Sequence, residues 1–191
     1  RGLLNPTVGE MSLRVDSGAC LITASDWGLM PLQASDLVFV NLAGRWLPEN
    51  GHPVPPTYRL HAQIYARHPH IESIITACPP YLSAYALTAH PMDTRSIPES
   101  YVMLMDAPTL PYASMSQVIA QTIGRRAPIV LLPHFGAVVT GTSALNAFDR
   151  LEVAEFSARS LIETPSIGAL EPMSPDDLSA LEKIFASWLQ P

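Results

Sequence analysis

The side chains that could do chemistry in this chain are six histidines, two cysteines and one lysine among 191 residues. Schiff-base chemistry needs a desolvated active-site amine. Lys183 is the single lysine and lies in the charged stretch LEKIF near the C-terminus, so covalent lysine chemistry is not expected. Cys20 and Cys78 form neither a disulfide framework nor a paired zinc spacing. Cys78 is expected to be a small buried group and not a nucleophile, because no cation evident nearby would lower the pKa of its thiol.

The stretch that has to position several of these residues runs from residue 54 to residue 87. Apolar residues recur at helical spacing after a Pro-Pro pair, which fixes where the helix can begin. A short β-branched run follows, as expected of a buried strand. The predicted elements are a helix between Pro56 and Pro69, a strand over 71–77 and a second helix over 81–89.

The rest of the chain alternates between short strands and longer helical patterns. A hairpin turn at 41–44 joins successive strands directly. It disfavours the alternative fold class, a doubly wound parallel α/β fold. Proline at 175, between Ser174 and two aspartates, is a helix start signal. The predicted strands cover 20–23, 37–40, 71–77, 103–105, 129–132 and 137–140, and the further helices cover 116–126, 143–163 and 174–188.

Length and composition exclude several classes of protein. The chain is 48% hydrophobic with a net charge of −6, which favours one folded domain over 1–191 and gives no basic footprint for nucleic acid. Apolar runs are all too short for a transmembrane helix. Two unpaired cysteines suggest a reducing compartment, so we expect a cytoplasmic protein with no membrane partner.

His61, Ile64 and Tyr65 follow a His-x-x-Ile-Tyr pattern just before the predicted 71–77 strand, and Gly9, Ser12 and Arg14 open the chain in a Gly-x-x-Ser-x-Arg pattern. Together with the order of turns and strands, these positions resemble the class II aldolase and adducin family, with its L-fuculose-phosphate aldolase-like fold. The resemblance extends from Leu3 to about Glu163. It implies an α/β fold, a three-layer α/β/α sandwich around a largely antiparallel central sheet, often assembled as a tetramer.

The resemblance also implies a divalent metal held by three histidines beside a carboxylate base, which suits zinc and stabilises an enediolate during carbon–carbon cleavage. The matching metal positions here are Thr76, Cys78 and His134, and Thr57 stands for the base. Two of the three histidines that hold the metal in the family are replaced here, so no cofactor is expected. The alternative is a zinc ion held by Thr76, Cys78 and His134. For His134, a hydrogen-bonded place in the core is expected ahead of a ligand role.

The anion pocket implied by the resemblance is altered as well. Glu10 and Asp26 place carboxylates where the family has asparagine and glycine, and the two family serines are prolines here. We therefore expect that sugar phosphates do not bind in the family's way. Glu10 has a second explanation, as a solvated turn residue paired with Arg14. The candidate substrate-binding residues are Glu10, Thr23, Ser25 and Asp26.

Two further candidates come from a Pro-Glu-Ser-Tyr pattern found in some family members. Tyr101 is a candidate because family aldolases lend a tyrosine to a neighbouring subunit's site. The alternative explanation for Glu99 and Tyr101 is a surface loop with a partly buried aromatic ring. The candidate catalytic residues are Thr57, Glu99 and Tyr101.

Three functions remain open from the sequence. The main prediction is a non-catalytic assembly or binding domain, a homo-oligomer with a possible protein partner, because Thr57, Thr76 and Cys78 stand where the family's own chemistry needs other groups. The alternative is a lyase, decarboxylase or epimerase acting on a small oxo or hydroxy acid or sugar derivative. A metal-dependent sugar-phosphate aldolase with a shifted alignment is the third.

Overall fold

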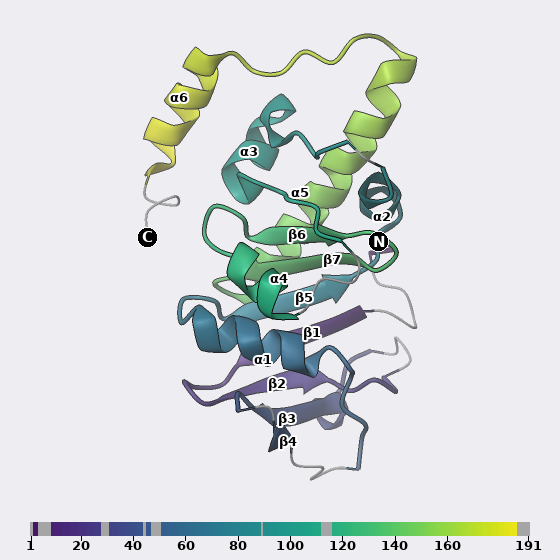
Figure 1. Cartoon of the computed structure of the whole chain (residues 1–191), viewed down its shortest axis with the longest axis vertical. Helices are drawn as coiled ribbons and strands as arrows, with labels where there is room; N and C mark the ends of the chain where they lie inside the picture. Colours follow the sequence, from purple (N-terminus) through teal and green to yellow (C-terminus); the bar gives the residue numbers. More distant parts are fainter. Residues whose placement is uncertain are drawn as a thin grey trace.

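The structure, a computed structural model, describes residues 2–3, 9–27, 31–43, 45–46, 51–88, 90–111 and 116–186. Its centre is a seven-stranded sheet in the order β4-β3-β2-β1-β5-β7-β6 (Figure 1). The strands are β1 (Gly9–Arg14), β2 (Ala19–Thr23), β3 (Leu37–Asn41), β4 (Arg45–Trp46), β5 (Ser73–Ala77), β6 (Ile129–Leu132) and β7 (Gly136–Gly141). The helices are α1 (Tyr58–Arg67), α2 (Pro80–Ala86), α3 (Pro98–Leu104), α4 (Ser116–Thr122), α5 (Ala144–Glu163) and α6 (Pro175–Ile184), with short 3-10 turns η1 (Ala34–Asp36), η2 (Thr94–Ser96) and η3 (Thr164–Ser166).

Every ladder between these named strands is antiparallel. Hairpins join β1 to β2, β3 to β4 and β6 to β7, and β5 completes the centre of the sheet between β1 and β7. The predicted antiparallel sheet is confirmed, and the doubly wound parallel alternative is wrong, because connections this short cannot return a chain to a parallel strand.

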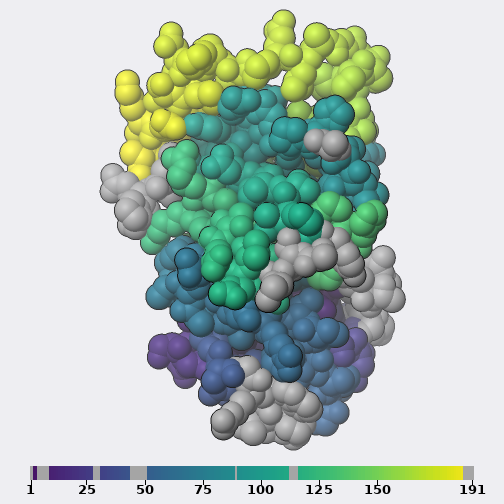
Figure 2. Space-filling model, viewed as in Figure 1, coloured from purple at the N-terminus to yellow at the C-terminus, as the bar shows by residue number. Residues whose placement is uncertain are grey.

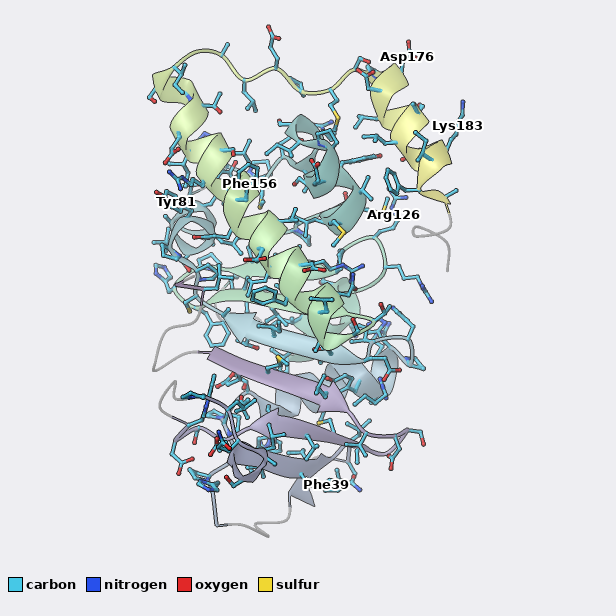
Figure 3. The ribbon with its side chains drawn as sticks, turned by 180° about the vertical axis from the view of Figure 1, so that it is seen from behind. Phe39, Tyr81, Arg126, Phe156, Asp176 and Lys183 are labelled. Carbon is cyan, nitrogen blue, oxygen red and sulfur yellow. The ribbon has the colours of Figure 1, made fainter. Side chains whose placement is uncertain are left out.

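Helices cover both faces of the sheet, as the three-layer prediction requires. Side chains of one strand alternate between the faces. Ile74 of β5 therefore packs in the core beneath α1 and α4, and Ile75 packs in the core beneath α2 and α5. Figure 3, seen from behind, shows α5 running across its face of the sheet. All five residues of β5 are buried, since both of its faces are covered.

Helices α1 and α5 take their positions from local sequence signals. In α1, Leu60, Ile64 and Tyr65 form one buried face, and the helix ends ahead of Pro69. In α5, the Ser143 hydroxyl accepts a hydrogen bond from the backbone N–H of Asn146 and caps the first turn. Helix α1 begins at one end of the strands, and α5, which follows β7, begins at the other end.

The structure corrects five predicted elements. Strand β5 begins at Ser73 and not at 71, and helix α2 ends at Ala86 and not at 89. Residues 103–105 are not a strand: Met103 and Leu104 end α3, which begins at Pro98 with proline in its first turn. A four-residue apolar run cannot distinguish a strand from one helical turn. Helix α4 ends at Thr122, before Gly124, and not at 126. Helix α6 ends at Ile184, and Trp188, its predicted end, lies outside the described residues.

The C-terminal segment lies away from the strands. In Figure 2 the yellow segment that includes α6 covers the end of the molecule where α3 lies. The Tyr101 hydroxyl of α3 donates to the Glu182 carboxylate of α6 at 2.6 Å, and the backbone N–H of Met173 donates to the carbonyl of Arg95. This contact between α3 and α6 is remote from the strand ends that carry the other predicted site residues.

Candidate functional site

One edge of the sheet collects most of the residues predicted to form a site. Because neighbouring strands are antiparallel, β2, β5 and β6 end where β1 and β7 begin, and α1 also begins there (at right in Figure 1). The structure brings eight predicted residues to this edge: Glu10, Thr23, Ser25, Asp26, Thr57, Thr76, Cys78 and His134.

Glu10 lies between the sheet and the start of α1. It stands opposite Thr76 in the β1–β5 ladder, and the Thr57 hydroxyl donates a hydrogen bond to its carboxylate at 2.5 Å. Burial raises the pKa of Glu10, and the bond from Thr57 opposes that rise only in part. A half-buried acid with a raised pKa can hold and deliver a proton nearer to neutral pH than an exposed glutamate.

The predicted pairing of Glu10 with Arg14 as a solvated turn is wrong. Arg14 points along the same face but reaches the other end of α1, where its guanidinium donates to the carbonyls of Tyr65, His68 and Ile71 at 2.8–2.9 Å. Glu10 is a strand residue that α1 partly covers. Two side chains four residues apart on one strand share a face but need not share a partner.

A chain of buried hydrogen bonds begins at Thr76. The Thr76 hydroxyl lies 2.9 Å from His61 Nε2, His61 Nδ1 lies 2.8 Å from the Ser12 hydroxyl, and that hydroxyl lies 2.8 Å from the Tyr65 hydroxyl. Burial lowers the pKa of His61 to about 3, so its ring is neutral, with one nitrogen donating and the other accepting. His61 therefore has a structural role in the core.

Cys78 follows β5 at the same edge. Its thiol donates to the carbonyl of Phe135, and its pKa is raised by burial and then by the negative charge of Glu10. Both effects keep the group a thiol, in agreement with its expected lack of nucleophilic character. Gly136, with φ +118°, lets the start of β7 pass close to the end of β5. A Cβ at this position would meet the Ala77 carbonyl and lie 2.8 Å from Cys78 Sγ.

The comparisons with known proteins agree with this architecture. A family model described as class II aldolase and adducin N-terminal domain matches residues 1–162. The chain belongs to the class II aldolase and adducin family.

Two curated members of this family match over nearly the whole chain. A 3-oxo-tetronate 4-phosphate decarboxylase of Pectobacterium atrosepticum is 27% identical, over 95% of this chain and 85% of that protein. A 3,4-dihydroxyphthalate decarboxylase of Arthrobacter keyseri is 25% identical, over 98% and 83%. Both matches extend well past the strands into the helical C-terminal part.

Solved structures match the fold as closely. YgbL of Klebsiella pneumoniae is 29% identical with a TM-score of 0.78, over 95% of this chain and 90% of that one. An L-fuculose 1-phosphate aldolase, 21% identical over 96% and 88%, has a TM-score of 0.83 and shows the shared fold alone. The predicted family and fold are confirmed. None of the described helices is long and apolar enough to span a bilayer.

The three metal positions implied by the family have other contacts here. The Thr76 hydroxyl bonds to His61 inside the core, and the Cys78 thiol bonds to a carbonyl. His134 is exposed in the β6–β7 turn with φ +65°, so the predicted buried place in the core is wrong. Within the described residues, no group of three or more His, Cys, Asp and Glu side chains has a metal-binding arrangement.

Two of the candidate substrate-binding residues, Ser25 and Asp26, contact the segment that leads into α1, and Thr23 contacts β1. Thr23 accepts a hydrogen bond from the backbone N–H of Met11, and the Ser25 hydroxyl donates to the carbonyl of Pro53. The Asp26 carboxylate lies 3.1 Å from His52 Nδ1. Asp26 therefore has a counter-ion within the chain when His52 is protonated, which the sequence did not predict.

Glu99 and Tyr101 do not join the other candidates within this chain. Both lie on α3, beyond β6, where Tyr101 contacts Glu182. Sequence reasoning missed Ser12 and Tyr65 as polar partners of His61. The sequence held a signal for this contact. Ser12 lies two residues after Glu10, on the same face of the strand, and Tyr65 follows His61 by one helical turn.

Proposed function

We propose that this protein is a carbon–carbon lyase that decarboxylates a small 3-oxo acid, with Glu10 as the proton donor. The observation that carries the proposal is the half-buried Glu10 carboxyl, bonded to Thr57 and with a raised pKa, at the edge where the family site residues gather. The names of the relatives favour this enzymatic alternative over the non-catalytic assembly domain that the sequence first suggested.

The substrate class follows from what the chain's residues can supply. When a 3-oxo acid loses carbon dioxide, the C–C bond to the carboxylate breaks and its electron pair moves onto the substrate's own ketone. The resulting enolate then takes up one proton to give the ketone product. Glu10 in its acid form supplies that proton and recovers it from water. Thr57 holds the carboxyl in place for this transfer.

We infer that no zinc ion takes part. Zinc prefers thiolate, imidazole and carboxylate ligands, whereas Thr76 is a poor ligand and is engaged by His61. Cys78 is held as a thiol beside a carbonyl and Glu10. Decarboxylation of a 3-oxo acid suits such a site, because the electron pair of the breaking C–C bond moves onto the ketone of the substrate itself. In the family's reaction a metal would stabilise that charge.

The carboxylates at this edge also favour a substrate without a phosphate group. Glu10 is neutral in its active acid form, and Asp26 has His52 as a counter-ion when that ring is protonated, so neither residue offers a doubly charged phosphate a positive partner. A carboxylate substrate carries one negative charge, which passes to the enolate as carbon dioxide leaves and is neutralised when Glu10 donates its proton. We therefore propose an unphosphorylated oxo acid, in contrast to the phosphorylated substrate named for the Pectobacterium relative.

The experiment measures carbon dioxide release from a panel of unphosphorylated C4–C6 3-oxo acids, with and without hydroxyl groups. Glu10→Gln keeps the size of the side chain but removes the proton, so kcat should fall about 10²–10⁴-fold. Glu171→Gln, the same change in the exposed segment after α5, is the matched control and should leave kcat unchanged. Activity in the wild type should decrease as pH rises through the pKa of Glu10, because the acid form is the active one.

Several outcomes would count against the proposal. Turnover of none of these acids by the wild type would return the chain to the non-catalytic explanation. Equal kcat in the wild type and Glu10→Gln would remove Glu10 as the donor. Activity lost to a chelator and restored by zinc would contradict the metal-free site.

A further inference from the structure

A small polar pocket lies at the edge of the sheet opposite the candidate site. It has a volume of about 50 Å³, and the residues around it include His70, Arg125, Thr142 and Arg150. These come from the α1–β5 turn, the α4–β6 loop, the β7–α5 loop and the second turn of α5. Strand β7 runs from the candidate site to this pocket, about 16 Å at roughly 3.3 Å per residue. The pocket is therefore separate from the Glu10 site.

Arg150 is a partly buried cation at this pocket, and its hydrogen-bond partners are neutral carbonyls. Its guanidinium donates to the carbonyl of Met103 at 3.1 Å and to the carbonyl of Thr140 at 2.7 Å. Burial lowers its pKa to about 10. Among the described residues, no carboxylate forms an ion pair with Arg150. Buried charges are ordinarily paired, so a partner from outside the chain would complete this one.

Several cationic groups lie around His70 at this pocket. After burial, the causes that lower the pKa of His70 are Arg125, His68, Arg150 and Arg14, all cationic or able to become so. The acid Glu72 also adjoins the pocket through its backbone bond to Gly141, but its side chain is exposed and lies 3.9 Å from Arg14. This positive cluster stands out in a chain with a net charge of −6. Such a cluster raises the local concentration of anions.

We propose that this pocket binds a small tetrahedral oxyanion of the phosphate or sulfate class between His70, Arg125 and Arg150. The two bonds of Arg150 account for two of the five N–H donors of a guanidinium, whose fork suits an oxyanion. A water molecule needs about 10–15 Å³ by the same measure, so the cavity has room for roughly four oxygen atoms. The proposal does not depend on the function proposed for the Glu10 site.

Two sources could supply this anion. One is free inorganic phosphate or sulfate. The other is the phosphoryl group of a larger metabolite, whose remainder would have to leave the pocket between the α4–β6 and β7–α5 loops. The pocket is small and comparatively enclosed, which favours the free anion.

The experiment is isothermal titration of the full chain with inorganic phosphate, sulfate and glycerol phosphate at constant ionic strength, because exposed charges are screened by salt. Phosphate and sulfate should bind saturably with Kd in the millimolar range or below. Arg125→Gln and His70→Gln should each weaken binding at least 10-fold. Arg125 and His70 lie outside the buried core, so both variants should keep the fold. They are preferred to variants of Arg150, whose two bonds to backbone carbonyls support the fold.

Arg126→Gln is the matched control. It removes the same charge from the adjacent residue, but Arg126 lies 4.0 Å from Asp106 and faces the segment after α3, so the affinity for phosphate should not change. Binding of phosphate and not of glycerol phosphate would identify a free-anion site, and tighter binding of the ester would identify a phosphoryl site. No saturable binding at 20 mM, or equal affinity in the wild type and Arg125→Gln, would overturn the proposal.

Discussion

Replacing His61 tests whether the buried polar chain stabilises the fold in the way its geometry indicates. His61→Leu keeps the approximate volume of the side chain but removes both ring nitrogens. Thr76 then loses its bond at 2.9 Å, while Ser12 keeps the Tyr65 hydroxyl at 2.8 Å. An unsatisfied buried hydroxyl costs about 1–3 kcal/mol, so the free energy of unfolding at pH 7.5 should fall by that amount.

The same substitution should reverse its effect in acid. The pKa of His61 in the folded protein is about 3, against an ordinary value of 6.5 in the unfolded chain. Its stabilising contribution is therefore complete above pH 6.5 and is lost as pH falls toward 3, because the unfolded chain binds a proton that the folded chain excludes. The loss is about 1.4 kcal/mol per pH unit in this window. Wild type and His61→Leu should reach equal stability near pH 5, and the variant should be the more stable below it.

Urea unfolding from pH 7.5 to 4.5, at one protein concentration, measures both effects. The carboxylates, including Glu10, titrate in both proteins and cancel in the difference between the two curves. Thr76→Val is the companion variant: it removes one hydrogen bond but keeps the titrating ring, so its difference from the wild type should change much less with pH. A difference between wild type and His61→Leu that stays constant over this range would refute a neutral, buried His61.

Three more predictions concern the site and the assembly. Gly136→Ala should destabilise the protein by several kcal/mol in thermal unfolding, because φ is +118° and the new Cβ would meet the Ala77 carbonyl; an unchanged Tm would show that the β6–β7 turn can shift. Dialysed protein should hold well below one zinc per chain by elemental analysis, and one full equivalent that is lost on His134→Ala would contradict this. Light scattering at micromolar concentration should give a molar mass several times the 20.7 kDa of one chain, as for a symmetric tetramer. The reasons are that only 15% of the residues are charged and that α5 carries Phe156, 60% exposed, on its outer side (Figure 3). A monomer at that concentration would reject assembly.

The fold could be predicted from the sequence because its signals are local. Pro55, Pro56 and Pro69 bound α1 wherever the rest of the chain lies, and the β-branched run before Cys78 gives β5. The turn at 41–44 requires an antiparallel pair. The failure at 103–105 has the same origin, since four apolar residues fit either a strand or one helical turn, and only packing against α5 decides between them.

The site could be predicted only in part, because its chemistry depends on contacts between distant residues. Burial at the start of α1 raises the pKa of Glu10, and the hydrogen bond from Thr57, 47 residues later in the chain, opposes part of that rise. A turn glutamate in the same sequence context would be solvated. The strand register adds the second condition, since it sets Glu10 opposite Thr76 and turns both toward α1. A shift of one residue would send Glu10 to the α5 face.

The replacement at Thr76 links the core to the site. At this position the family's pattern has a histidine at the end of the strand, whereas here a threonine hydroxyl completes a chain that continues through His61 and Ser12 to Tyr65. A hydroxyl bonded inside the core no longer points a donor atom at a substrate. Glu10 lies opposite Thr76 at this edge, and its burial raises its pKa. In the function we propose, the change from histidine to threonine removes a metal ligand from this edge and leaves proton transfer by Glu10 as the step that the protein supplies for decarboxylation of an oxo acid.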